Sequence, residues 1–331
     1  MQPQFNWLLV IVAGALILVF FSNFVVQYTK LAQEREDAKL ALLIEGQLDS
    51  FSNNLLHTSI DPDGIDYFNA KFSCKNKESY VGIDNFMVKT KETVFAPDDI
   101  RTDRLLVSID KFELPYRVEN ILFVSPQNIK YYFSKGLEAL ENDLPRTFGT
   151  EKPFFNTEIL DKFSLNKIRD DTKKEALREV VFVLKDNENI AFSELATLGV
   201  RIKTIIIESA DEDFGKFKQR VYEKQVDGVK VQESEGVWIK NLVFGAIFSD
   251  AYECEFSQLI GQLENMNKLY REKNLRLWSK SKTCGYELMM STFDKTQQAI
   301  DAKDYTGLLN SAELLDRQNK KLFENGCVEL F

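Results

Sequence analysis

The stretch that decides the architecture is Trp7 to Val26, WLLVIVAGALILVFFSNFVV, which contains no charged residue. The first charged side chain of the chain is Lys30. Because an α-helix rises about 1.5 Å per residue, about 20 apolar residues cross the roughly 30 Å hydrocarbon core of a bilayer. Trp7 and Tyr28 stand at the two ends of the stretch, as in the aromatic belts of membrane helices. The sequence predicts a transmembrane anchor over residues 1–28, in contact with the lipid bilayer through residues 7–26.

A cleaved signal peptide is the alternative to an anchor. Such a peptide has a basic N-terminal region, a short apolar core and a small-x-small exit. Here no basic side chain precedes Trp7, and the stretch ends in NFVVQY without an Ala-x-Ala step. We therefore expect an uncleaved single span, with the rest of the chain on one side of the membrane.

Composition indicates that the rest of the chain is folded. The chain has 331 residues, of which 44% are hydrophobic and 26 are phenylalanine, enough for the anchor and two domains of ordinary size. The net charge is −9, from 42 basic and 51 acidic residues. An acidic domain of this kind argues against a nucleic-acid partner.

Two signals in the sequence disagree about the side of the membrane on which the large domain lies. Lys30, Arg35 and Lys39 follow the span and no basic residue precedes it, which by the positive-inside rule favours a cytoplasmic domain. Four cysteines, an even number, favour an oxidising exterior. Long domains translocate largely regardless of flanking charge, so we favour an extracytoplasmic domain at a cell membrane.

A juxtamembrane helix is predicted over residues 29–58. Apolar residues recur there every three or four positions and form one stripe: Leu40, Ile44, Leu48, Phe51 and Leu55. The stripe can pack on the chain's own domain, the interpretation we favour. Alternatively, it can pair with a protein partner or a second copy as a short coiled coil.

The sequence predicts a mixed α/β domain over residues 59–250. Six β-branched or aromatic runs between residues 70 and 133 predict strands: AKFSC, YVGIDNFMVKT, TVFAP, RLLVSIDKF, VENILFVSP and IKYYF. A short helix is expected at residues 134–142, and residues 145–167 look irregular. VVFVL, a helix over 190–198 and RIKTIIIES then form a βαβ pattern, which predicts two parallel strands. A hairpin is expected around Asp227-Gly228.

Residues 251–331 change to a helical period and predict a three-helix bundle with helices at about 251–279, 285–302 and 305–325. The fold class is thus α+β, or mixed α/β: a transmembrane helix, a mixed β-sheet domain with a βαβ unit, and a C-terminal helical bundle.

The four cysteines fall at informative places on this map. Cys284 opens the second helix of an up-down-up bundle and Cys327 follows the third, so the two lie at one end. Cys254 opens the first helix, beside the β region that holds Cys74. Among three possible connectivities, this placement favours Cys284–Cys327 and Cys74–Cys254. The alternative is four unpaired cysteines in a cytoplasmic domain.

Catalytic motifs are missing from the sequence. It has no G-x-G-x-x-G, P-loop, G-x-S-x-G or H-E-x-x-H pattern, and its one histidine, His57, predicts no metal site. We therefore expect no cofactor and no enzymatic activity. Asp186, Asn187 and Asn189 follow the VVFVL strand, at the edge where α/β sheets bind ligands. They are weak candidates for a ligand-binding loop, and a polar connection with helix-capping residues is the simpler interpretation.

Several segments together resemble a set of uncharacterised archaeal single-pass membrane proteins. The segments are QFNWLLVIVAGALILVFF, AKFSC, VFAPDDIRTDRLLVSIDKFELPYRVENILFVSP, KYYF, VFGAIFSDAYEC and the terminal NGC. The resemblance spans most of the chain and contains no catalytic motif. It implies an archaeal envelope protein with an external domain, and it assigns no functional residue.

Three functional hypotheses follow from the sequence. The first is a membrane-anchored extracytoplasmic structural or interaction protein. The second is a minor pilin-like envelope subunit, because one continuous apolar helix leads a globular head. The third is a ligand-binding or enzymatic domain that uses the βαβ loop.

Overall fold

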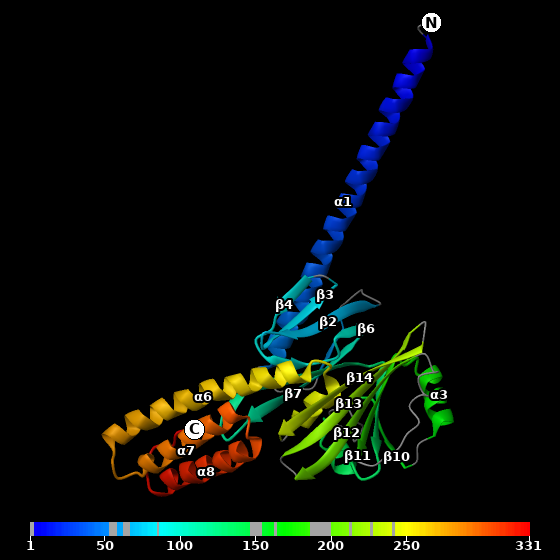
Figure 1. Cartoon of the computed structure of the whole chain (residues 1–331). Helices are drawn as coiled ribbons and strands as arrows, with labels where there is room; N and C mark the ends of the chain where they lie inside the picture. Colours follow the sequence, from blue (N-terminus) through cyan, green and yellow to red (C-terminus); the bar gives the residue numbers. More distant parts are fainter. Residues whose placement is uncertain are drawn as a thin grey trace.

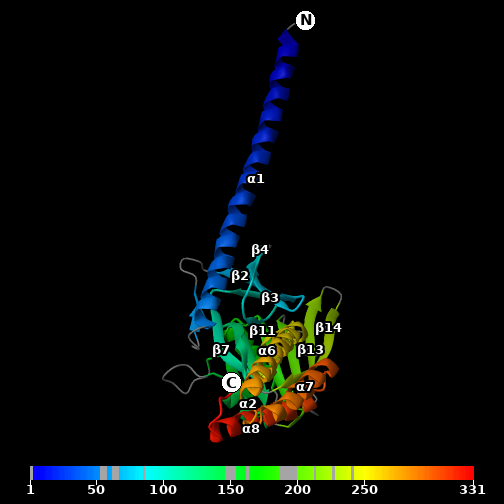
Figure 2. The same ribbon diagram turned by 90° about the vertical axis from the view of Figure 1, so that its left-hand side faces the viewer.

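One long helix, α1 (Pro3–Ser52), leads away from a folded head (Figures 1 and 2). The computed structural model describes residues 3–52, 58–61, 67–84, 86–145, 154–161, 164–185, 200–211, 214–225, 228–239 and 242–331. Within these ranges, α1 is the helix that is long and apolar enough to cross a membrane. The predicted anchor and the predicted juxtamembrane helix are thus one uninterrupted helix over Pro3–Ser52; residues 53–57 lie outside the described residues, and Thr58, expected at the end of the helix, begins a strand instead.

The two halves of α1 have opposite environments. In the first half the large apolar side chains are exposed, with Leu18 at 69% and Phe20 at 67%. In the second half Ala41, Ile44 and Leu48 are at most 1% exposed. They pack against β3 and β4, and they share a core with the four-stranded sheets. The expected packing on the chain's own domain is confirmed for the stripe residues Leu40, Ile44, Leu48 and Phe51, whereas Leu55 lies outside the described residues.

Replacing Ile44 with alanine should destabilise the head by about 2–4 kcal/mol, because the change leaves a cavity in a closed core. Leu43 is the matched control, since its side chain is 45% exposed on the same helix. Leu43→Ala should change stability by less than about 0.5 kcal/mol. Urea unfolding of both variants in non-ionic detergent, followed by tryptophan fluorescence, measures the difference. Equal effects of the two substitutions would show that α1 does not pack on the head as described.

Three sheets form the β part of the head. An antiparallel sheet next to α1 has the order β4-β3-β2-β6, and a mixed sheet has the order β1-β7-β8-β5. The third sheet has six strands in the order β10-β9-β11-β12-β13-β14. The strands are β1 (Thr58–Ile60), β2 (Phe68–Lys75), β3 (Glu78–Ile83), β4 (Phe86–Lys89), β5 (Thr93–Phe95), β6 (Asp99–Thr102), β7 (Leu105–Glu113), β8 (Arg117–Pro126), β9 (Ile129–Ser134), β10 (Thr157–Leu160), β11 (Glu179–Lys185), β12 (Arg201–Asp211), β13 (Phe214–Gln225) and β14 (Gly228–Ile239).

The six-stranded sheet has a parallel half and an antiparallel half. β10, β9, β11 and β12 are parallel, and β13 and β14 then continue as an antiparallel hairpin. The predicted parallel pairing of VVFVL with RIKTIIIES is confirmed, as is the hairpin. The helix expected at 190–198 lies outside the described residues.

Both faces of this sheet are covered, as the continuous apolar run in β11 requires. Val181 and Val183 face a large core that also includes the C-terminal helices. Val180 and Phe182 face the opposite way and pack with Ile168 of α3 (Leu165–Lys174). The structure therefore has a helix and a strand, α3 and β10, in a region where the sequence led us to expect irregular structure up to residue 167.

The C-terminal part is helical, as predicted. α6 (Tyr252–Lys280), α7 (Tyr286–Ala302) and α8 (Tyr305–Glu324) each begin and end within one residue of the expected bounds. The described residues also form two short helices, α2 (Glu138–Asn142) and α5 (Leu242–Phe248). α5 packs tightly on β5, because a Cβ atom at Gly245 would lie 2.6 Å from the ring of Phe95.

Candidate functional site

Charged residues gather where the parallel strands begin. The register of β9, β11 and β12 places Ile129 and Arg201 on either side of Glu179, so the amino ends of the three strands meet at one edge. Arg178, which precedes β11, donates its backbone N–H to the carbonyl of Asn128 at 3.1 Å. The turn before β9 and the start of β11 are thus joined at this edge.

A network of buried ion pairs lies directly behind the edge. The Arg201 guanidinium contacts Glu179 at 3.0 Å and Asp250 at 2.8 Å. Lys203, whose side chain is 1% exposed, lies 3.4 Å from the other Asp250 oxygen and donates to the carbonyl of Ser249. The network ties the six-stranded sheet to the connection between α5 and α6.

Burial and neighbouring charges act in opposite directions on these carboxyl groups. Burial favours the neutral form of Asp250, but Lys203 and Arg201 more than offset it, so its pKa lies below its ordinary value. For Glu179, burial outweighs the attraction of Arg201, and its pKa is raised. Asp98, nearby, also has a raised pKa because of its burial and the charge of Asp250. One deeply buried anion, Asp250, is therefore held by two cations.

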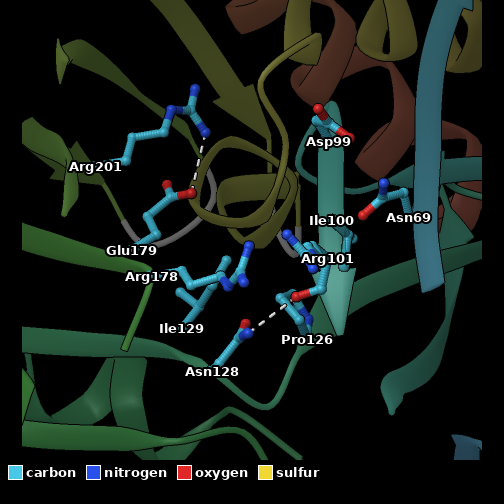
Figure 3. Close-up of a pocket in the computed structure, with 10 residues that line it drawn as sticks. All are labelled: Asn69, Asp99, Ile100, Arg101, Pro126, Asn128, Ile129, Arg178, Glu179 and Arg201. Atoms are coloured by element: carbon cyan, nitrogen blue, oxygen red, sulfur yellow. Dashed lines mark hydrogen bonds and ion pairs between the residues drawn. The ribbon is translucent and has the colours of Figure 1, made fainter. Parts of the chain in front are cut away.

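In front of this network is a pocket of about 370 Å³, which we call the arginine pocket (Figure 3). It lies between β6 and the amino ends of β9, β11 and β12. Ten residues line it: Asn69, Asp99, Ile100, Arg101, Pro126, Asn128, Ile129, Arg178, Glu179 and Arg201.

The three arginines that line the pocket differ in their partners. Arg201 is engaged by Glu179 and Asp250. Among the described residues, no ion pair or side-chain hydrogen bond involves the guanidinium of Arg101 or of Arg178. Figure 3 shows these two guanidinium groups turned toward each other in the pocket. The backbone carbonyl of Arg101 accepts a hydrogen bond from Asn128 Nδ2 at 3.0 Å, which fixes β6 beside the turn.

A second pocket, of about 490 Å³, lies against α1. Gln33, Glu36 and Asp37 of the helix line it together with Tyr67 and Asp84 of the head. It shares Asn69 and Arg101 with the arginine pocket. The two pockets therefore adjoin each other at Asn69 and Arg101.

The ligand loop suggested by the sequence cannot be located. Asp186, Asn187 and Asn189 lie outside the described residues. They follow Lys185 at the carboxyl end of β11, whereas the arginine pocket is at the amino end. The sequence did contain one signal for the pocket, because charged residues stand at the start of two buried strands. Arg178 and Glu179 stand at the start of β11, and Arg201 is the first residue of β12.

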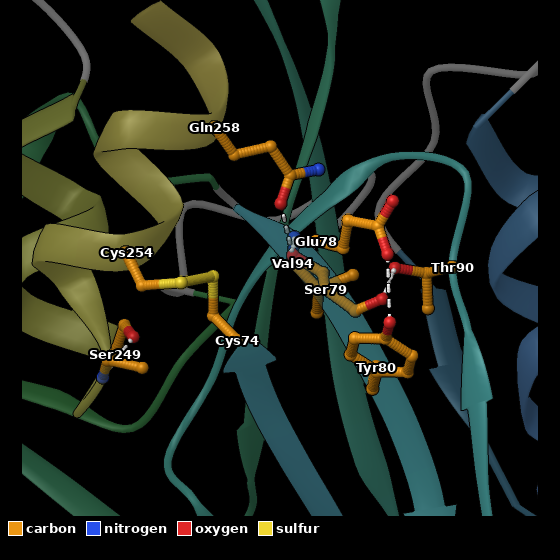
Figure 4. Close-up of a disulfide and its surroundings, with 10 residues drawn as sticks. Cys74, Glu78, Ser79, Tyr80, Thr90, Val94, Ser249, Cys254 and Gln258 are labelled. Carbon is orange, nitrogen blue, oxygen red and sulfur yellow. Dashed lines mark hydrogen bonds between the residues drawn. A yellow bond between two sulfur atoms is a disulfide. The ribbon is translucent and has the colours of Figure 1, made fainter. Parts of the chain in front are cut away.

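All four cysteines are paired, in the connectivity favoured from the sequence. Cys74 bonds to Cys254 with the Cα atoms 5.8 Å apart, and Cys284 bonds to Cys327 with the Cα atoms 5.9 Å apart. Beside the first disulfide, the hydroxyl of Ser79 donates to Gln258 Oε1 at 3.0 Å (Figure 4). The start of α6 is therefore fixed to both β2 and β3.

Another carboxyl group with a shifted pKa lies in the mixed four-stranded sheet. Burial raises the pKa of Glu119 to about 7, although side-chain and backbone hydrogen bonds from Thr93 act in the opposite direction. The hydroxyl of Thr93 donates to Glu119 Oε1. Below pH 7 the native state thus binds a proton at this position.

Stability should fall as the pH rises from about 4.5 to 7, by up to about 3 kcal/mol from Glu119 alone, because the unfolded chain releases this proton first. Glu119→Gln keeps an oxygen acceptor for Thr93 and removes the titration. We expect the stability of the variant, relative to the wild type, to increase over this pH range. Urea unfolding of both proteins at pH 5 and pH 8 gives that difference. A difference that stays constant with pH would show that Glu119 titrates normally.

No family model, curated protein or solved structure matches the chain.

Proposed function

We propose that the chain is a membrane-anchored protein whose disulfide-bonded head lies outside the cytoplasm and acts by recognition. The observation that supports this most strongly is the division of α1 into an exposed apolar half and a half that is buried in the head. An exposed apolar helix of this length is costly in water and stable in lipid. Since the helix is continuous, the head is held at a fixed distance from the membrane instead of on a flexible linker.

The disulfides support the external side. Within the described residues no cysteine is free, and both bonds join elements far apart in the sequence, by 180 and 43 residues. Disulfides of this kind persist in oxidising compartments and are rare in the cytosol.

The anchor is tested by extraction and by N-terminal sequencing. We expect the protein to stay in the membrane fraction after an alkaline carbonate wash and to retain Trp7–Val26. Release into the wash, or a mature N-terminus beyond Val26, would instead support a cleaved signal sequence. The side is tested on right-side-out vesicles with external protease, which should digest the head. A head that is protected until detergent is added would place it inside.

A filament subunit, like a minor pilin, is a second candidate. One observation favours it: the exposed apolar surface of α1 continues beyond the predicted span, with Leu31 at 48%, Leu42 at 52% and Leu43 at 45% exposure. Such a surface can pack against the same helix of neighbouring copies. Negative-stain microscopy and sedimentation after mild extraction test this candidate, and a uniformly monomeric protein would eliminate it.

A further inference from the structure

We propose that the arginine pocket binds a small polyol that carries a tetrahedral oxyanion, either phosphate or sulfate. The proposal rests on Arg101 and Arg178, which reach one cavity from β6 and from the residue before β11. It does not depend on which side of the membrane the head occupies.

The charged groups behind the pocket and those in the pocket differ in how well they are neutralised. The inner groups neutralise one another, because Glu179 and Asp250 are held by Arg201 and Lys203 at distances of 2.8–3.4 Å. Of the described residues that line the pocket, those that remain charged are Arg101 and Arg178, for which no ion pair is found in the described part of the chain, and Asp99. Arg101 and Arg178 are exposed to solvent, and their guanidinium groups face each other while the carboxylate of Asp99 lies apart from them (Figure 3). A bound dianion relieves their mutual repulsion.

The chemistry of the donors favours such a dianion. A guanidinium presents a planar fork of N–H groups that matches phosphate and sulfate oxygens in pairs. Two forks from different elements can hold a tetrahedral group from two sides. The side-chain amide of Asn69, which also lines the pocket, is a further potential donor.

The size of the cavity and the position of Asp99 indicate which kind of molecule carries the oxyanion. A volume of about 370 Å³ exceeds what an inorganic ion needs and lies in the range of about 300–1,000 Å³ typical of small-molecule sites. In Figure 3 the carboxylate of Asp99 lies at a distance from the two guanidinium groups, toward the other end of the pocket. A carboxylate accepts hydrogen bonds from hydroxyl groups, so this end suits the polyol part of the ligand.

The test is calorimetric titration of the full chain in non-ionic detergent at about 50 mM salt. The probes are glycerol 3-phosphate, inorganic phosphate and inorganic sulfate. The double variant Arg101→Gln/Arg178→Gln should bind at least tenfold more weakly, because each change removes charge-assisted hydrogen bonds. Arg276→Gln/Arg317→Gln removes the same charge from exposed positions of α6 and α8 and should bind within twofold of the wild type. Should the double variant misfold, the single variants Arg101→Lys and Arg178→Lys keep the charge, lose the fork and should each weaken binding severalfold.

A membrane lipid can present the same chemistry, and a second arm separates the two sources. The thermal midpoint of the chain is measured in nanodiscs of phosphatidylcholine with and without phosphatidylglycerol. A stabilisation by phosphatidylglycerol that disappears in Arg101→Gln/Arg178→Gln, without binding of the soluble probes, supports the site with a lipid headgroup as its ligand. Absence of any effect in both arms, or equal binding by wild type and all variants, would overturn the proposal. Neither result bears on whether α1 is an anchor.

Discussion

Arg201→Met is expected to destabilise the head by about 3–5 kcal/mol. The substitution keeps much of the side-chain volume and removes the cation that lies between Glu179 and Asp250. Both carboxylates are at most 8% exposed, so water cannot replace the lost charge, and only Lys203 remains to balance them. Removing one partner of a buried ion pair lowers the free energy of unfolding by about this amount, because the other charge stays buried without compensation. The measurement is the urea midpoint and slope in detergent at pH 7.

The control for this prediction lies on the neighbouring strand, in register with Thr204 of β12. Arg220 of β13 pairs with Glu233 of β14 at 2.9 Å, with side chains that are 37% and 63% exposed. Arg220→Met should cost less than about 1 kcal/mol, since exposed ion pairs contribute little. If the two methionine variants proved equally stable, Arg201 would not be part of a buried network.

Replacing both Cys74 and Cys254 with serine is expected to cost about 4–5 kcal/mol. The bond closes a loop of 180 residues, and the loss of loop-closure entropy in the unfolded chain grows with loop length. The pair Cys284 and Cys327 closes a loop of 43 residues, so its removal should cost about 1 kcal/mol less. The first bond also joins β2 to α6, next to the Ser79–Gln258 hydrogen bond that joins β3 to the same helix.

Thermal unfolding of the two double-serine variants and of the wild type, with and without reductant, measures these costs. In reductant all three proteins lose every disulfide, so their unfolding temperatures should converge on a common value below that of either variant without reductant. A wild type that unfolds at the same temperature in both conditions would mean that the disulfides contribute nothing to the fold.

The elements predicted best from the sequence are those with long or strongly periodic patterns. An uncharged run of 20 residues has few alternatives to a helix, and β11 and β12 are recognisable as buried parallel strands because their apolar runs are continuous. The disulfide connectivity could be predicted because the helix order fixes which ends meet.

Short elements were missed where local signals were weak. α3 has the sequence LNKIRDDTKK and buries chiefly Ile168, so its position is set by the sheet that it covers.

The run YVGIDNFMVKT looked like a single strand, but β3 and β4 form a hairpin with a turn at Asp84, whose φ is 48°. Aspartate tolerates this left-handed conformation better than most residues, and the turn signal is only two residues long.

The arginine pocket could not have been predicted in the same way. Its residues come from β2, β6, the β8–β9 turn and the starts of β11 and β12, which are distant in the sequence. Only the packing of the antiparallel sheet beside the six-stranded sheet brings Arg101 and Arg178 together. The loop at Asp186 was suggested because α/β sheets bind ligands at the carboxyl ends of their strands. Ligand binding by this loop stays a prediction.

The central claim is that α1 tethers a disulfide-bonded head outside the cytosol. Mass spectrometry of the protein from its native membrane, alkylated at once and digested without reductant, tests this claim most directly. We predict two cross-linked peptides, one joining Cys74 to Cys254 and one joining Cys284 to Cys327, and no alkylated cysteine. Recovery of all four cysteines in alkylated form would contradict both the bonds and the compartment inferred from them.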